Sequence, residues 1–206
     1  MRRFVSARKG ALAEWLGSTV KTTVIVLVLF VLIPVGGQAE EQPGSARWTL
    51  LGGYGITHTG LGKTKLWLET VDLVGRYERV LSSRLGASWY RGYHSLLVEL
   101  PLHLVIQPSA DPMIGLNFLA GWTFTHWPEL RPYVFIGGGP LYTGGDIPGM
   151  GARINGNYQV GAGLRFPLAN RRQLVLEYRF HHVSNGGLED PNDPLNSSKL
   201  LLGITF

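Results

Sequence analysis

A histidine and a serine stand two residues apart near the C-terminal end of the chain, at His182 and Ser184. A serine hydroxyl is a weak nucleophile until a neighbouring base removes its proton during attack. Residues two apart in a β-strand share a face and lie ~6.6 Å apart along it, a distance that two side chains can bridge. The pair therefore indicates serine-based hydrolysis, although any His-x-Ser sequence in a strand meets the same criterion.

The elements that would position this pair are short alternating segments separated by turn residues. Glycines fall inside these segments as well as between them, and no long apolar run occurs after residue 40. Eight strands are predicted, at 47–57, 66–81, 95–107, 113–126, 133–142, 154–166, 173–184 and 198–206. Pro101 marks a bend or bulge in the third strand. The stretch Ser82 to His94 fits neither a strand nor a short turn well. Eight such strands with short connections predict an all-β fold, an eight-stranded antiparallel barrel.

The strand at 173–184 has two chemically different faces. One face is apolar up to its end and consists of Leu174, Leu176, Tyr178, Phe180, His182 and Ser184. The other consists of Val175, Glu177, Arg179, His181 and Val183. The charged face is predicted to face the barrel interior, with Glu177 and Arg179 paired and His181 bonded to one of them. His182 and Ser184 are then on the lipid-facing side.

The first forty residues differ in kind from the rest of the chain. An apolar run at 24–35 follows several basic residues and is shorter than the ~20 residues that span a bilayer. Small residues, Gly37 and Ala39, follow the run and suit signal peptidase. The pattern predicts a signal peptide over residues 1–39 and a mature barrel over residues 40–206. The alternative is an uncleaved anchor helix.

Removal of the leader removes most of the charge. The whole chain has a net charge of +5, and residues 1–39 contain five basic residues and one acidic residue. The remaining chain is therefore nearly neutral, and its composition gives no reason to expect nucleic-acid binding. The chain has no cysteine, so disulfide frameworks and cysteine metal sites are excluded.

The C-terminal strand favours a membrane barrel over a soluble one. Leu200, Leu202, Ile204 and Phe206 lie on one face and end at a terminal aromatic, which is similar to the last strand of Gram-negative outer-membrane proteins. Five tryptophans are candidates for interfacial girdles: Trp48, Trp67, Trp89, Trp122 and Trp127. A lipocalin-like soluble barrel is the alternative. With both termini in the periplasm, the connections after odd-numbered strands are external, so His182 and Ser184 are expected at the outer leaflet.

The stretch 180–196, FHHVSNGGLEDPNDPLN, resembles the lipid A 3-O-deacylase family, the PagL-like outer-membrane acyl hydrolases. That family has His-x-Ser-Asn at the end of its seventh strand, then a small residue, a glycine and an asparagine. The resemblance implies a site on the outer surface of the barrel, with Ser184 as nucleophile and His182 as general base. It also implies that the Gly187 N–H and the Asn192 side chain stabilise the oxyanion.

One position departs from the family pattern. Where the family has a glutamate that orients the histidine, this chain has Asn196, whose parity matches the outward face of the last strand. An asparagine can orient an imidazole but cannot stabilise the imidazolium by charge. Asn196 is a candidate third member of the site, and the loop acids Glu189, Asp190 and Asp193 are the alternatives.

The function implied is hydrolysis of the ester-linked 3-hydroxyacyl chain at position 3 of lipid A, in lipopolysaccharide of the outer leaflet. No cofactor is implied, and no metal, because the remaining histidines lack metal-ligand spacing: His58, His94, His103 and His126. The alternative is a non-catalytic outer-membrane barrel with a structural or adhesive role. The sequence leaves open the preferred acyl length and whether the barrel forms a homodimer.

Overall fold

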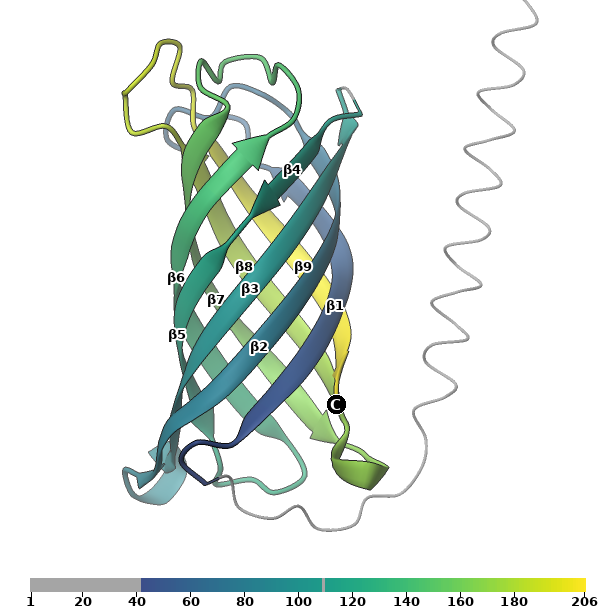
Figure 1. Ribbon diagram of the computed structural model, residues 1–206, viewed down its shortest axis with the longest axis vertical. Helices are drawn as coiled ribbons and strands as arrows, with labels where there is room; N and C mark the ends of the chain where they lie inside the picture. The colour runs from purple at the N-terminus through teal and green to yellow at the C-terminus, as the bar shows by residue number, and fades with distance from the viewer. Residues whose placement is uncertain (1–41, 109) are drawn as a thin grey trace, which may run out of the picture. The chain divides into compact units, whose positions relative to one another are not determined.

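The computed structural model describes residues 42–108 and 110–206, which form a closed antiparallel β-barrel (Figure 1). The strands are β1 (Ala46–Thr57), β2 (Glu69–Leu85), β3 (Gly92–Gln107), β4 (Pro112–Gly115), β5 (Asn117–Phe124), β6 (Arg131–Thr143), β7 (Ile154–Pro167), β8 (Gln173–Ser184) and β9 (Leu195–Thr205). β4 and β5 each pair with β3 and β6, every other strand pairs with the strands before and after it in the chain, and β1 closes the ring by pairing with both β2 and β9. Since β4 and β5 share one place in the ring, the described residues form an eight-stranded barrel, which confirms the predicted fold.

The interruption between β4 and β5 has a simple cause in two prolines. Pro101 of β3 and Pro140 of β6 flank the gap, and neither has an N–H to donate to it. The register is the same on both sides of the gap, since Leu102 pairs with Ile114 and Glu99 with Asn117. Pro101 therefore breaks the hydrogen-bonded ladder without producing the predicted bulge.

The hairpin between β2 and β3 corrects the sequence prediction. Both strands run further than the predicted limits of residues 81 and 95, to Leu85 and from Gly92. A short 3-10 turn, Ser88–Tyr90, follows Gly86, whose φ of +74° turns the chain. The aromatic residues of the turn lie next to strand residues and obscure the alternation. The largest other differences are at the starts of two strands, since β2 begins at Glu69 rather than 66 and β9 at Leu195 rather than 198.

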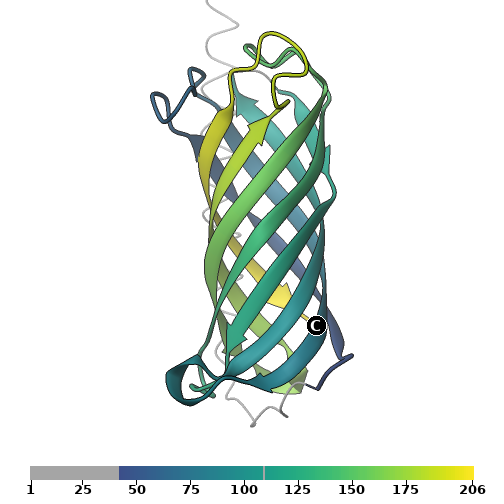
Figure 2. The same ribbon diagram turned by 90° about the vertical axis from the view of Figure 1, so that its left-hand side faces the viewer.

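The connections differ in size between the two ends of the barrel. Loops 58–68, 144–153 and 185–194 lie at one end, whereas the C-terminus and the tight turns between β2 and β3 and between β7 and β8 lie at the other (Figure 1). Figure 2 shows the strands tilted around the barrel, so that β8 and β9 bring their polar ends to the loop-rich end. This arrangement agrees with the prediction that the connections after odd-numbered strands share one end of the barrel.

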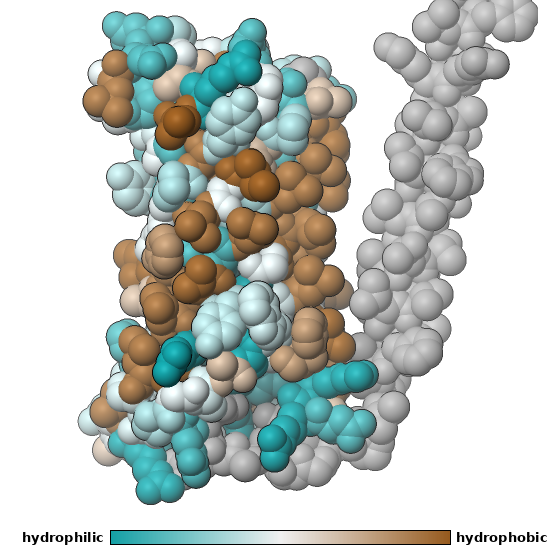
Figure 3. All heavy atoms as spheres, viewed as in Figure 1, coloured by the Kyte–Doolittle hydropathy of each residue, from teal (hydrophilic) through white to brown (hydrophobic). Residues whose placement is uncertain are grey.

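The outer surface of the barrel is apolar over its middle. Side chains such as Leu100, Ile136 and Leu200 are about 60% exposed, and Figure 3 shows a broad hydrophobic surface between more polar ends. The terminal residue Phe206 is 64% exposed, as the parity of the last strand predicts. Four of the five tryptophans are largely exposed: Trp48, Trp67, Trp89 and Trp127. An apolar outer band over a polar interior is the pattern of a membrane-spanning barrel.

The interior contains a hydrogen-bonded set of charges. Arg76 of β2 bonds to Glu99 of β3 and Glu177 of β8, each at 2.7 Å. Arg179 bonds to Glu99 at 2.8 Å and also to Glu177, which confirms the predicted interior pair. These four side chains are at most 1% exposed. Buried charges are tolerated when their partners satisfy them, and here they join three strands across the barrel.

The predicted signal peptide, residues 1–39, lies outside the described residues. Among residues 42–108 and 110–206, no helix has the length and apolar character needed to cross a membrane.

Candidate active site

Three neighbouring strands position the sequence-predicted pair. His182 of β8 lies directly opposite Asn196 of β9 on one side and Tyr158 of β7 on the other. Ser184 lies two residues further along β8, opposite Gly156 of β7. The alternation is the predicted one, because the even-numbered side chains of β8 face outward and the odd-numbered ones are buried. His182 and Ser184 therefore lie on the outer surface, at the loop-rich end of the barrel.

The three polar side chains form a continuous hydrogen-bonded series. The Nε2 atom of His182 is 3.1 Å from the Ser184 hydroxyl oxygen, and Nδ1 is 2.8 Å from Asn196 Oδ1. Since an amide oxygen only accepts, Nδ1 must carry the proton and donate it to Asn196. Nε2 is then an acceptor facing the serine hydroxyl, which is the arrangement in which a histidine acts as a base toward serine. This geometry can activate Ser184 for attack on an ester carbonyl.

Asn196 is buried although its strand position faces outward. Its parity is that of Leu200 and Leu202, as the sequence predicts, but the residue is only 8% exposed. The cover comes from loop 58–68, to which both the backbone and the side chain of Asn196 are bonded. Asn196, which lies between His182 and this loop, is thus shielded from solvent, while His182 and Ser184 stay half-buried.

The loop acids that were alternatives to Asn196 have other surroundings. Asp193 pairs with Lys65 at 2.8 Å and so ties loop 185–194 to loop 58–68. Glu189 and Asp190 are exposed. The backbone carbonyl of Glu189 accepts a bond of 2.7 Å from Asn185 Nδ2. Asn196 is therefore the side chain that the structure brings to His182 Nδ1.

The residues expected to stabilise an oxyanion lie in loop 185–194, which Asn185 organises. This side chain is 4% exposed, and its Oδ1 accepts the Gly187 N–H at 2.8 Å. The Asn185 N–H donates to Asn192 Oδ1 at 3.1 Å. Gly186 and Gly187 both have positive φ, +68° and +79°, which lets the loop turn directly after Ser184. The Gly187 N–H therefore points toward the Asn185 side chain. The Asn192 side chain accepts the Asn185 N–H with its amide oxygen, so its NH2 group stays available as a donor.

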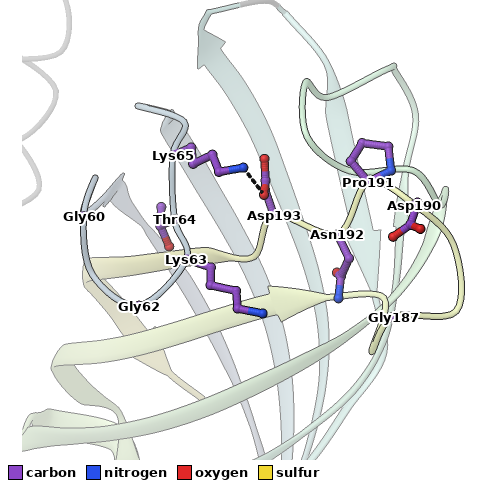
Figure 4. Close-up of a pocket in the computed structure, with 10 residues that line it drawn as sticks. All are labelled: Gly60, Gly62, Lys63, Thr64, Lys65, Gly187, Asp190, Pro191, Asn192 and Asp193. Atoms are coloured by element: carbon purple, nitrogen blue, oxygen red, sulfur yellow. Dashed lines mark ion pairs between the residues drawn. The ribbon is translucent and has the colours of Figure 1, made fainter.

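A polar cleft of about 1000 Å³ lies between loops 58–68 and 185–194 (Figure 4). Gly187 and Asn192 line it from one side, and Lys63 and Lys65 from the other. Figure 4 shows the Lys63 and Asn192 side chains extending toward the same space. The cleft is large enough for a polar headgroup, and Gly187 in its lining lies three residues after Ser184 in the chain.

An apolar groove of about 570 Å³ approaches His182 from the opposite direction, on the outer wall of the barrel. It crosses β6, β7 and β8, and its lining consists of Ile136, Gly137, Gly138, Gly139, Tyr158, Gln159, Val160, Phe180 and His182. The glycines form its floor because nothing larger fits. A Cβ on Gly138 would come 2.0 Å from the Asn157 carbonyl oxygen. These glycines therefore let β6 pack closely against its neighbouring strands, and the same packing leaves room for an alkyl chain.

Two neighbours of the pair were not singled out from the sequence. The Tyr158 ring lies 6.1 Å from the His182 ring, and Tyr158 is 63% exposed. Gly156 keeps the surface beside Ser184 low, since a Cβ there would lie at ordinary contact distance, 3.6 Å or more, from its nearest atoms. Only strand pairing reveals both, because Tyr158 and Gly156 are more than twenty residues from the motif.

His181 is buried as predicted, but its partner is different. Its Nε2 is 3.3 Å from Asn157 Oδ1, and its ring lies 5.2 Å from that of His103. Arg179 and Glu177, the expected partners, bond instead to Glu99 of β3 and Arg76 of β2, across the barrel. In the part of the chain that the structure describes, no three His, Cys, Asp or Glu side chains form a group that could hold a metal.

Comparisons with known proteins agree with the barrel fold. A family model described as lipid A 3-O-deacylase (PagL) matches residues 52–205. The crystal structure of the outer membrane enzyme PagL is 17% identical, covering 77% of this chain and 98% of that one, with a TM-score of 0.52. The crystal structure of Neisserial surface protein A is 12% identical, covering 78% of this chain and 95% of that one, with a TM-score of 0.56. These two likenesses show the fold. No curated protein matches the chain significantly.

Proposed function

The chain belongs to the lipid A 3-O-deacylase (PagL) family, and on that premise we propose that it is a serine esterase that removes the ester-linked 3-hydroxyacyl chain from position 3 of lipid A. The observation that carries the proposal is the hydrogen-bonded series from Ser184 through His182 to Asn196 on the outer wall of the barrel. A substrate embedded in a membrane leaflet meets the protein at this wall.

The proposed reaction has two acyl-transfer steps. His182 Nε2 takes the proton of the Ser184 hydroxyl as its oxygen attacks the ester carbonyl, and the same proton then goes to the leaving sugar oxygen. The acyl chain remains on Ser184 as an ester. A water molecule, deprotonated by His182, attacks that ester and releases the free 3-hydroxy fatty acid. The serine regains its proton, and no cofactor is required.

Asn196 keeps the imidazole in the productive orientation throughout. Its amide oxygen accepts a hydrogen bond from the His182 Nδ1–H at 2.8 Å, so it favours the tautomer in which Nε2 can act as base. As a neutral group it stabilises the imidazolium less than a carboxylate would. We therefore expect a slower chemical step than in a site whose surroundings accommodate an acid beside the histidine.

The oxyanion of the tetrahedral intermediate requires donors close to Ser184. The Asn192 NH2 group is the main candidate, because its partner oxygen is already bonded to the Asn185 N–H. The Gly187 N–H joins it only when Asn185 Oδ1 releases that hydrogen. Each donor of this kind contributes ~3 kcal/mol to transition-state stabilisation.

The two hollows next to the pair suit the two halves of the substrate. The apolar groove over Gly138 and Val160 would hold the acyl chain, and the polar cleft beside Lys63 would hold the sugar headgroup. The scissile ester, which joins these halves, then lies at Ser184. We place the barrel in the bacterial outer membrane with loops 58–68 and 185–194 facing outward, after a signal peptide over residues 1–39 has been removed.

Mass spectrometry of lipid A from a Gram-negative host tests the proposal. Cells that express the wild-type protein should lose one 3-hydroxyacyl chain from lipid A, whereas cells that express folded Ser184→Ala should retain it. Heat-modifiable gel mobility checks that both proteins fold in the membrane. If the wild type removes no chain, the barrel is a non-catalytic surface protein. If the alanine variant removes as much as the wild type, Ser184 is not the nucleophile and the proposed serine mechanism is wrong.

A further inference from the structure

An asparagine in place of an acid creates a problem of orientation at this site. A side-chain amide has an oxygen on one side and a nitrogen on the other, of nearly equal size. If the nitrogen faced His182, it would donate to Nδ1, and the ring proton would move to Nε2. Nε2 would then donate to Ser184 instead of accepting from it, and the serine would lose its base. The site therefore works only if something outside it holds the amide in one orientation.

Loop 58–68 contains the groups that do this. Asn196 Nδ2 donates to the Leu61 carbonyl at 3.1 Å and to Thr64 Oγ1 at 2.8 Å. The Asn196 backbone N–H donates to the same Thr64 oxygen at 3.0 Å. A carbonyl oxygen only accepts, so the atom facing Leu61 must be the NH2 group. The oxygen is thereby turned to His182.

The loop is tightly folded around this contact. Thr64 is 2% exposed. Its N–H donates to the Leu61 carbonyl at 3.2 Å, and its carbonyl accepts the Gly60 N–H at 2.9 Å. The loop is attached to β9 through the His58 N–H, which donates to the Asn196 carbonyl at 2.8 Å. Gly60 and Gly62 have φ of +88° and +58°, conformations that glycine adopts readily.

We propose that Thr64 is a positioning residue: with the Leu61 carbonyl, it holds the Asn196 amide oxygen toward His182 and so keeps the catalytic tautomer. The inference rests on the proposed function. It also accounts for the asparagine itself. A carboxylate at this position would turn its second oxygen toward the Leu61 carbonyl, which places two acceptors in contact. Loop 58–68 and Asn196 are therefore matched to each other.

The test compares Thr64→Val, which keeps the shape but removes the acceptor, with Thr64→Ser, which keeps the hydroxyl. Purified barrels in detergent with a lipid A substrate should show kcat about tenfold lower for the valine variant, with KM unchanged, because the hydrogen bond that Thr64 Oγ1 accepts from the Asn196 side-chain amide is lost and the Leu61 carbonyl alone then favours one amide orientation. Thr64→Ser should keep nearly the full kcat. Equal losses in both variants would mean that packing of the methyl group matters instead, and would overturn the inference.

A double-mutant cycle separates positioning from a general effect on the loop. In an Asn196→Ala background, which has no amide to orient, Thr64→Val should lower kcat no further. An additional tenfold loss there would overturn the inference. The ring-nitrogen chemical shifts of 15N-labelled His182 give a second measurement: Nδ1–H should dominate in the wild type and decline in Thr64→Val, and an unchanged tautomer would contradict the inference.

The inference and the proposed function fail in different ways. If Ser184→Ala keeps full activity, the proposed function itself is wrong. If Ser184→Ala abolishes activity while Thr64→Val equals the wild type, only the role of Thr64 is wrong.

Discussion

The two faces of β8 carry polar groups with different roles. Facing inward, Glu177 and Arg179 are almost fully buried and bond to charges on β2 and β3. Facing outward, His182 and Ser184 are half-buried and join a neutral amide from β9. Glu177 and Arg179 each make several hydrogen bonds, whereas the Ser184 hydroxyl bonds to His182.

The difference shows how one strand can support both stability and chemistry. Removing a partner from the inner set leaves a buried charge unpaired, which costs far more than the loss of one neutral hydrogen bond. The outer set contains no charge that needs burial, so its atoms stay available to a substrate. Substitutions on the inner face should therefore affect folding, and those on the outer face should affect activity.

The adjacent histidines give the sharpest contrast. His182→Gln should lower kcat by ~10⁴-fold, since it removes the base that activates Ser184, while leaving stability nearly unchanged. His181→Gln, on the inner face, should keep most of the activity and lose some stability. Activity on lipid A and urea unfolding, measured on both variants, provide the comparison. If His181→Gln were as inactive as His182→Gln, the two faces would not be separate in function.

Glu177→Ala tests the inner face. It leaves Arg76 and Arg179 without one of their shared carboxylates and should lower the free energy of unfolding by ~3–5 kcal/mol. Tryptophan fluorescence during urea titration in lipid vesicles measures this. Leu176→Ala, the neighbouring outward residue, is the matched control and should cost less than ~1 kcal/mol. Similar losses in both variants would contradict a special role for the inner charges.

Val160→Phe tests the apolar groove on the outer face. The larger side chain should fill space next to Gly138 and lower kcat/KM about tenfold for a long acyl chain, with a smaller effect on a short one. Val134→Phe, outward on β6 but outside the groove, should have little effect. The readout is kcat/KM on substrates of two chain lengths. An equal loss for both lengths would argue against the groove as the acyl site.

Lys65→Met should produce the smallest change. The pair between Lys65 and Asp193 joins two loops, but the lysine side chain is 75% exposed. Exposed pairs contribute ~0–1 kcal/mol, so stability and activity should stay close to those of the wild type. Arg153→Met, which removes an exposed basic residue paired with Asp146 outside both hollows, serves as a control for charge alone. A large loss of activity in Lys65→Met only would show that this loop contact supports the site after all.

Much of the fold follows from local alternation. The inward and outward faces of β8 and β9 are as the sequence predicts, because side chains alternate with a period of two whatever the partner strand. The exact ends of β2 and β3 could not be read in this way. There, Trp89 and Tyr90 of the turn continue the aromatic character of the strands, so composition does not mark the boundary.

For the candidate site, too, some features follow from the local sequence and others depend on the tertiary structure. The sequence by itself determined that His182 and Ser184 share one face of a strand and that this face is apolar, since both facts depend on neighbours in the chain. The tertiary structure decided what lies around them. Asn196 reaches His182 through strand register, and loop 58–68 buries that asparagine through contacts that span more than one hundred residues. Such contacts arise only when the barrel closes β9 against β1, which is why no local pattern contains them.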